Sequence, residues 1–198
     1  MVDELNLDGL SIQDNPINRG TKAGGANTNK NGLSYETLTD LSSEFTIIEK
    51  SKYSKTIKFG ESDKVFAFSK QSHFFKYMDK HVDKNIRKAH GCKNPDECYI
   101  DDANKIIFIL EKKFQKVSGS VCEKIQTADF KQWQYERTFP SYKIVYMYCL
   151  SDWFSANCIA ELEYLKLKNV PVFMGNDDEY KNKIITFMLN YESELQPQ

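Results

Sequence analysis

The chain has 198 residues, of which 40% are hydrophobic and 13% aromatic, and its formal net charge is −1. This length and composition predict one folded domain with a substantial core and exclude an intrinsically disordered chain. No apolar run approaches the ~18 residues of a membrane-spanning helix, and the acidic start lacks the apolar core of a signal peptide. We therefore expect a cytoplasmic protein without a membrane partner.

The cysteines also indicate an intracellular protein. There are five, at positions 92, 98, 122, 149 and 158, and most of them lie in apolar or helical contexts. An odd number in such contexts predicts reduced core residues. A zinc site formed by His90, Cys92 and Cys98 is an alternative, but the sequence offers no second pair of ligands with the usual spacing.

A net charge of −1 does not indicate a nucleic-acid-binding protein, but the distribution of charge does favour one. Local potential steers a polyanion more strongly than the total charge does. No acid occurs between Asn15 and Tyr35, where Arg19, Lys22 and Lys30 are found. Further basic residues surround residues 94–113, namely Lys80, Lys84, Arg87, Lys88, Lys93, Lys112, Lys113, Lys116 and Lys124.

The first 32 residues are predicted to form a flexible arm ahead of a domain over residues 33–198. Residues 15–32 are rich in Gly and Asn and nearly free of large apolar groups, so they cannot bury a surface of their own. One interpretation is a disordered tail. The other is an arm that enters a DNA groove, where bases and phosphates would be bound by Arg19, Lys22, Asn27, Asn29, Lys30 and Asn31.

The rest of the chain alternates between helical and strand patterns. We expect a helix from Leu33 capped by Ser34, a hairpin of strands 55–59 and 64–68, a helix over 71–89, and a hairpin of strands 94–100 and 106–113. A helix capped by Ser120 and Glu123, strand 142–150, helix 159–168, strand 170–174 and helix 180–189 follow. This order predicts an α/β fold with a mixed sheet flanked by helices.

The second hairpin carries the candidate catalytic residues. Its turn near Asp102 brings Asp96 back towards Glu111, and alternation along the strand places Lys113 on the same face as Glu111. Two carboxylates can hold Mg²⁺, which polarises a phosphate and helps to ionise water. A neighbouring ammonium can orient that water or stabilise developing charge. The alternative is an edge hairpin whose charges are simply solvated.

Pro95-Asp96 and Glu111-Lys112-Lys113 resemble the motif of the PD-(D/E)XK nuclease superfamily, which includes most type II restriction endonucleases. The resemblance covers roughly residues 24–36 and 94–154 and implies a restriction-endonuclease-like core. It also implies that Asp96 and Glu111 bind Mg²⁺ and that Lys113 positions or activates water. Asn31 to Glu36 resembles the start of many such enzymes, where an early helix contributes a glutamate, so Glu36 is expected to assist. Gln115 continues the face of Glu111 and Lys113 and is expected to touch the site or the phosphate.

The segment after Lys113 resembles a set of phage-type and restriction-type nucleases, in which an acid is expected at the position of Cys122. Lys116 and Lys124 are candidate DNA contacts, although the more usual explanation of Lys124 is a solvated or capping charge on a helix surface, paired with Glu123. The implied activity is site-specific, Mg²⁺-dependent cleavage of double-stranded DNA, and palindromic targets favour a homodimer. The alternatives are a structure-specific or repair nuclease, a DNA-binding module without turnover, and a nonenzymatic metal-binding or signalling domain.

Overall fold

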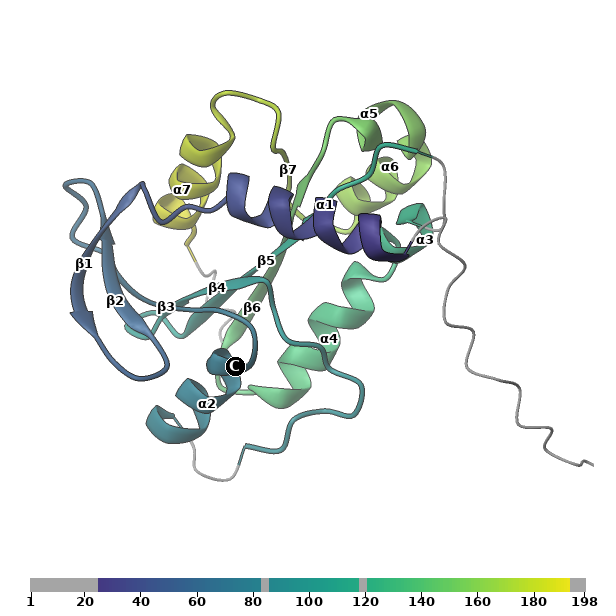
Figure 1. The fold of residues 1–198 in the computed structure, drawn as a ribbon. Helices are drawn as coiled ribbons and strands as arrows, with labels where there is room; N and C mark the ends of the chain where they lie inside the picture. Colours follow the sequence, from purple (N-terminus) through teal and green to yellow (C-terminus); the bar gives the residue numbers. More distant parts are fainter. Residues whose placement is uncertain (1–24, 83–85, 118–120, 193–198) are drawn as a thin grey trace, which may run out of the picture.

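The computed structural model describes residues 25–82, 86–117 and 121–192, with the backbone alone for residues 25–31. These residues form a mixed sheet with helices on both faces (Figure 1). The strands are β1 (Phe45–Lys50), β2 (Lys55–Phe59), β3 (Val65–Ser69), β4 (Glu97–Asp101), β5 (Ile106–Lys113), β6 (Lys143–Leu150) and β7 (Val172–Met174). The helices are α1 (Gly25–Leu38), α2 (Ser72–His81), α3 (Val121–Ile125), α4 (Ala128–Thr138), α5 (Trp153–Asn157), α6 (Ile159–Leu167) and α7 (Tyr180–Asn190). None of these helices is both long and apolar enough to cross a bilayer.

The seven strands lie in the sheet in the order in which they occur along the chain. From β1 to β5 every neighbouring pair is antiparallel, whereas β5, β6 and β7 are parallel to one another. A parallel pair needs a crossover, and the chain supplies it with α3 and α4 after β5 and with α5 and α6 after β6. The predicted α/β class with a mixed sheet flanked by helices is confirmed.

The core is divided into two layers by the alternation of side chains across the sheet. On one face, Ile107 and Ile109 pack in a cluster that includes residues of α2 to α6. On the other face, Phe108 and Leu110 pack with residues of α1 and α7, among them Tyr35. Strands that are buried on both sides should be continuously apolar, and β6 from Ile144 to Leu150 is buried throughout.

Helix α1 is fastened to the sheet by a buried lysine. Lys112 points to the α1 face, where its Nζ donates to Glu97 Oε1 at 2.7 Å and to the carbonyls of Thr39 at 3.0 Å and Glu36 at 3.2 Å. The side chains of Lys112 and Glu97 are only 1% and 2% exposed. The pair therefore joins the end of α1 to both strands of the β4–β5 hairpin.

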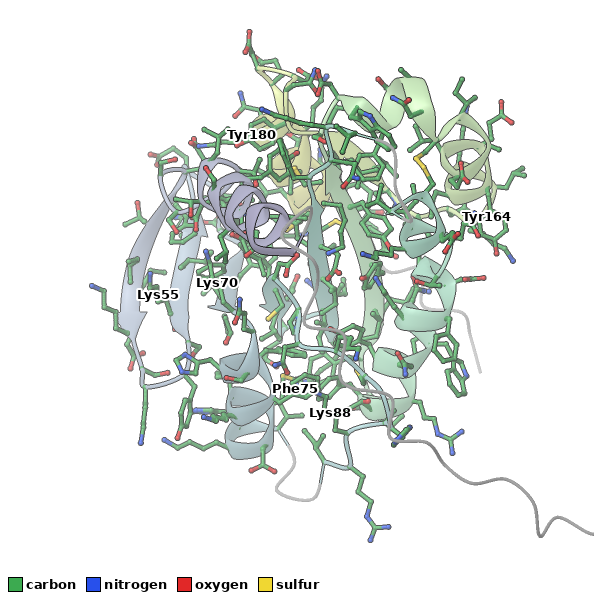
Figure 2. All side chains as sticks on the ribbon, turned by 45° about the vertical axis from the view of Figure 1, so that its right-hand side comes forward. Lys55, Lys70, Phe75, Lys88, Tyr164 and Tyr180 are labelled. Atoms are coloured by element: carbon green, nitrogen blue, oxygen red, sulfur yellow. A yellow bond between two sulfur atoms is a disulfide. The ribbon has the colours of Figure 1, made fainter. Side chains whose placement is uncertain are left out.

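Further polar groups complete this attachment. Lys70, labelled in Figure 2, pairs with Asp40 and lies 3.1 Å from Glu97 Oε1. The hydroxyl of Tyr99 donates to Glu97 Oε2 at 2.8 Å. Tyr180 of α7, also labelled in Figure 2, donates to the carbonyl of Leu38 at 3.2 Å. Glu97 is thus a buried charge with several partners, which offsets the cost of removing it from water.

The predicted hairpins appear as β2–β3 and β4–β5, and the predicted strands and helices after residue 142 appear as β6, α6, β7 and α7. Strand β1 was not predicted. Most of its residues are exposed. It lies at the edge of the sheet, where it pairs with β2. Isolated alternation of this length is a weak signal before its partner is known.

Two predicted boundaries are wrong. The first helix begins at Gly25 rather than Leu33, so the expected flexible arm over residues 1–32 is helical from Gly25 onward. A helix that is anchored at its far end extends at little cost, because propagation is easier than nucleation. Helix α2 ends at His81 rather than Ala89. Beyond it, the amide of Ala89 donates to Thr138 Oγ1 at 3.1 Å, which draws the chain against α4 instead.

We predict that Lys112→Met lowers the free energy of unfolding by ~3 kcal/mol, because it removes the buried ammonium partner of Glu97 and leaves that carboxylate with the more exposed Lys70. Adding Glu97→Gln to Lys112→Met should recover part of the loss. Urea denaturation measures both variants. The control is Lys168→Met, which breaks a 3.8 Å pair with Asp129 that is about half exposed and should cost less than ~1 kcal/mol. Equal losses in Lys112→Met and Lys168→Met would contradict the anchoring role of Lys112.

Candidate active site

The candidate site lies at the open end of the β4–β5 hairpin, next to the last residue pair of its antiparallel ladder. Glu97 pairs with Leu110, so the same register brings Asp96 level with Glu111. The amide of Lys112 donates to Asp96 Oδ2 at 2.8 Å. The side chain of Asp96 thus accepts a hydrogen bond in the place where a backbone carbonyl of β4 would otherwise accept it. The backbone of β5 holds this carboxylate in position.

Lys113 joins the two carboxylates. Its Nζ lies 2.7 Å from Glu111 Oε1 and 3.8 Å from Asp96 Oδ2. The exposed fractions of the three side chains are 24% for Lys113, 13% for Glu111 and 18% for Asp96. The structure thus brings together the predicted trio where β4 begins and β5 ends, in the middle of the sheet, partly shielded from solvent but still accessible.

Lys131 is a fourth charged residue at the site, and the sequence analysis missed it. It extends from α4, and its Nζ lies 3.5 Å from Glu111 Oε1 and 5.8 Å from the ring centroids of both Tyr146 and Tyr148. The two tyrosine rings of β6 thus lie beside the Lys131 ammonium. The only signal in the sequence was a lysine within a helical segment, which does not reveal the strand that the helix covers.

Glu36 also lies close to the trio. It is half-buried on α1 and lines a small hollow together with Asp96, Asp40 and Lys70. Its negative charge raises the pKa of both Asp96 and Lys113. Its own carbonyl accepts a hydrogen bond from Lys112, so the anchor of α1 sets the position of Glu36.

Gln115 lies beyond the end of β5, and its side chain is used locally. Its amide nitrogen Nε2 donates to the carbonyl of Val117 at 2.6 Å, and its backbone exchanges hydrogen bonds with Ser151 Oγ at 3.1 Å in both directions. The side chain shapes the turn after β5 in this structure, while the expected contact with substrate stays a prediction.

The protonation states of the site are set by burial and by the charges facing one another. Burial, with help from the Glu111 charge, raises the pKa of Asp96 to about 6, despite the opposing effect of Lys113. Burial would also raise the pKa of Glu111, but Lys113 and Lys131 hold it below its usual value. Lys113 has a raised pKa because the attraction of Glu111 and Asp96 outweighs burial, whereas burial lowers the pKa of Lys131.

The predicted DNA-binding residues fall in three places. Arg19 and Lys22 lie outside the described residues, and Asn27, Asn29, Lys30 and Asn31 lie in α1 where only the backbone is described. Lys116 is exposed after β5, with its Nζ 5.5 Å from the ring centroid of Phe114. Lys124 is exposed on α3. A contact of these residues with DNA stays a prediction.

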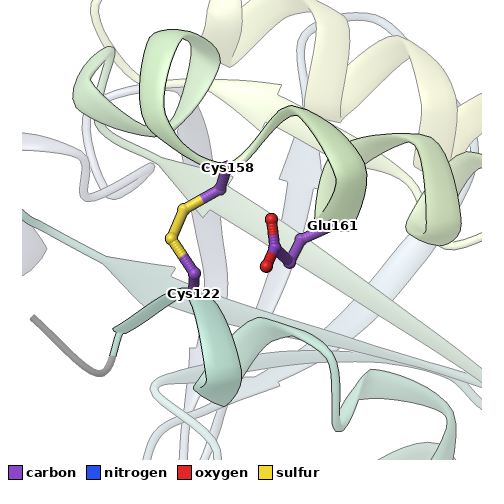
Figure 3. Close-up of side chains that lie close together, drawn as sticks. All are labelled: Cys122, Cys158 and Glu161. Atoms are coloured by element: carbon purple, nitrogen blue, oxygen red, sulfur yellow. A yellow bond between two sulfur atoms is a disulfide. The ribbon is translucent and has the colours of Figure 1, made fainter.

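The expectation that all five cysteines are reduced is wrong, because Cys122 and Cys158 form a disulfide (Figure 3). The bond joins α3 to the start of α6 across 36 residues of sequence. Cys92, Cys98 and Cys149 are free and buried, as expected. Spacing alone could not reveal the pair, because the two residues meet only after the crossover between β5 and β6 has folded.

Two sets of residues can be compared as metal ligands. Asp96 and Glu111 offer the hard oxygen atoms that Mg²⁺ prefers. In the described part of the chain, the one group with three ligand atoms within 4.8 Å of one another is Cys122, Cys158 and Glu161, so His90, Cys92 and Cys98 do not form the zinc site considered above. While Cys122 and Cys158 are bonded to each other, they have no thiolate to offer. The carboxylate pair is the better candidate for a hard cation.

We predict that Asp96→Asn stabilises the metal-free protein by ~2 kcal/mol at pH 7.5. The folded-state pKa of Asp96 is raised from 3.8 to about 6, so its contribution to stability is fully present below pH 3.8 and is lost as the pH rises through 6. Asparagine keeps the acceptor for the Lys112 amide and removes the buried charge. Urea denaturation with chelator at pH 7.5 and pH 4 measures the difference. A gain of the same size at both pH values would exclude this explanation.

We predict that reduction of the Cys122–Cys158 bond lowers the free energy of unfolding by ~4 kcal/mol, because the open chain regains the entropy of a 36-residue loop. Unfolding of the wild type should depend on dithiothreitol, whereas Cys158→Ser should be destabilised and independent of reductant. Cys92→Ser, which alters a free cysteine, is the control that should keep the dependence on reductant. A wild type whose stability is unchanged by reductant would refute the prediction.

Comparison with known proteins gives no relative from which a function can be transferred: no protein-family model, no curated protein and no solved structure matches the chain.

Proposed function

We propose that this chain is a Mg²⁺-dependent endonuclease that cleaves double-stranded DNA at specific sequences, in the manner of type II restriction enzymes. The observation that carries the proposal is the position of Lys113, whose ammonium is within ion-pair distance of both Asp96 and Glu111 where β5 ends. Two carboxylates can hold the metal and a neighbouring lysine can assist in metal-assisted phosphodiester hydrolysis.

Each group has a distinct role in this proposal. Asp96 and Glu111 hold the metal, which when bound acts as a Lewis acid on the phosphate and lowers the pKa of water. Lys113 donates to the attacking water or to the phosphate oxygens as negative charge develops on them. Lys131 reaches Glu111 from α4 and adds a second cation facing the phosphate. Glu36, on the opposite side, assists as a further oxygen ligand or through water.

The charge balance of the site fits a bound cation. Three carboxylates, from Glu36, Asp96 and Glu111, face two ammonium groups, from Lys113 and Lys131. The raised pKa of Asp96 reflects this uncompensated negative charge together with burial. A divalent ion would relieve the repulsion and keep Asp96 ionised. Proton competition should therefore weaken metal binding below about pH 6.

The DNA substrate and the homodimer rest on separate arguments. Exposed Lys116 and Lys124 lie on the segment that follows Lys113, where they can meet phosphates on either side of a cleaved bond. A palindromic target would be read by two copies related by a two-fold axis. A structure-specific nuclease and a DNA-binding module without turnover are the alternative functions that the same residues allow.

We predict that the purified protein cuts long, unmodified duplex DNA into discrete fragments in the presence of Mg²⁺ but not of chelator. Lys113→Ala should lower the cleavage rate at least ~100-fold, as removal of a charge-stabilising donor commonly does. Lys50→Ala, which alters an exposed lysine at the end of β1, should cleave like the wild type. Gel electrophoresis of the fragments and sequencing of their ends measure rate and site together.

Other results would favour the alternatives. Smearing without bands, or cutting confined to junctions and ends, would favour a repair or structure-specific nuclease. Retention of DNA in a gel-shift assay without any cleavage would favour a binding module. Metal-dependent cleavage that survives Lys113→Ala would overturn the role assigned to Lys113.

A further inference from the structure

The edge of the sheet next to β7 is incompletely paired. Strand β7 has three residues, and they pair only with Tyr148, Cys149 and Leu150 of β6. The first hydrogen bond on this side runs from the amide of Tyr148 to the carbonyl of Pro171 at 2.9 Å. Within the residues that the structure places, no strand pairs with the earlier half of β6, from Lys143 to Met147, on this side.

The peptide groups on this open edge can be identified from the neighbouring hydrogen bonds. The amide of Lys143 donates towards β5, to the carbonyl of Lys105 at 2.8 Å, whereas the amide of Tyr148 points towards β7. Successive residues of a strand in a parallel pair point their peptide groups to alternate sides. Ile144 and Tyr146 therefore present their N–H and C=O groups to the open edge.

A groove of about 870 Å³ runs along this edge. Its walls include Leu162 of α6 and Phe187 of α7, which cover opposite faces of the sheet, and its floor is the edge of β6. The groove therefore occupies the position that the next strand of the sheet would take. An unpaired strand edge of this kind is a template for another extended chain.

The charged residues described as lining the groove are all lysines. Lys143, Lys166 and Lys168 line it and are exposed, and none of the residues described as lining it is Asp or Glu. The Nζ of Lys168 lies 3.8 Å from Oδ2 of Asp129, a residue that does not line the groove. Lys143 and Lys166 should therefore attract an anion more strongly than Lys168 does. A ligand that fits must offer an extended backbone, apolar groups and negative charge.

We propose that this groove binds an extended acidic peptide of a partner protein, which adds a strand to β6 beside Ile144 and Tyr146. Backbone hydrogen bonds supply affinity in this mode of recognition, and side-chain contacts on alternate residues supply selectivity. A second copy of the chain is disfavoured as occupant, because it would bring two sets of lysines together. The proposal does not rest on nuclease activity, since the groove shares no residue with the Asp96, Glu111 and Lys113 site.

The test uses fluorophore-labelled peptides of alternating glutamate and valine and the full-length protein, with binding measured by fluorescence anisotropy. The corresponding lysine–valine peptide should bind at least ~10-fold more weakly. N-methylation of every peptide nitrogen should weaken binding at least ~10-fold, because the amides that face β6 can then no longer donate to it.

Variants of the protein complete the test. Lys143→Glu with Lys166→Glu should weaken binding at least ~10-fold, whereas Lys80→Glu, at the exposed end of α2, should leave it unchanged. Circular dichroism checks that the variants are folded. Absence of binding, equal affinity for the fully N-methylated peptide, or equal affinity for the lysine peptide would overturn the proposal. So would binding of an oligonucleotide in place of the peptide, with the same dependence on Lys143 and Lys166.

Discussion

The alternation of side chains along β5 is the constraint on which the rest of the molecule depends. Two consecutive lysines on this strand must point to opposite faces. Lys112 enters the layer beneath α1 and pairs with Glu97, while Lys113 faces the other layer and contacts Glu111 and Asp96. The first lysine fixes the helix that carries Glu36, and the second completes the charged cluster. A shift of one residue in register would exchange these roles and destroy both arrangements.

This arrangement concentrates unfavourable electrostatics at the ends of the central strands β4 and β5. Asp96 is held by a backbone amide but remains buried beside other carboxylates, and its raised pKa records that cost. A structural ion pair such as Lys112–Glu97 has instead nearly all its polar atoms matched. The contrast separates two kinds of buried charge in one hairpin: one that attaches a helix, and one whose carboxylate has a raised pKa, as is common at functional sites.

The parallel half of the sheet differs from the antiparallel half because it depends on crossovers. The helices between β5 and β6 supply Lys131 to the candidate active site, and the Cys122–Cys158 bond ties the start of that crossover to the next one. The last strand is too short to cover β6, so the sheet ends in a basic groove rather than a paired edge. The candidate site, at the ends of β4 and β5, and the open edge of β6 are therefore separate features, built from different residues of the same sheet.

The sequence by itself determined the elements that depend on local pattern. The β4–β5 hairpin, its turn, the face shared by Glu111 and Lys113 and the buried character of β6 all follow from alternation and turn chemistry within short windows. Only the tertiary structure decided contacts between distant segments. Lys131 meets Glu111 and Cys122 meets Cys158 because remote parts of the chain pack together. Local periodicity carries no information about such pairings, since they arise from burial of whole elements against one another rather than from any one segment's own preference.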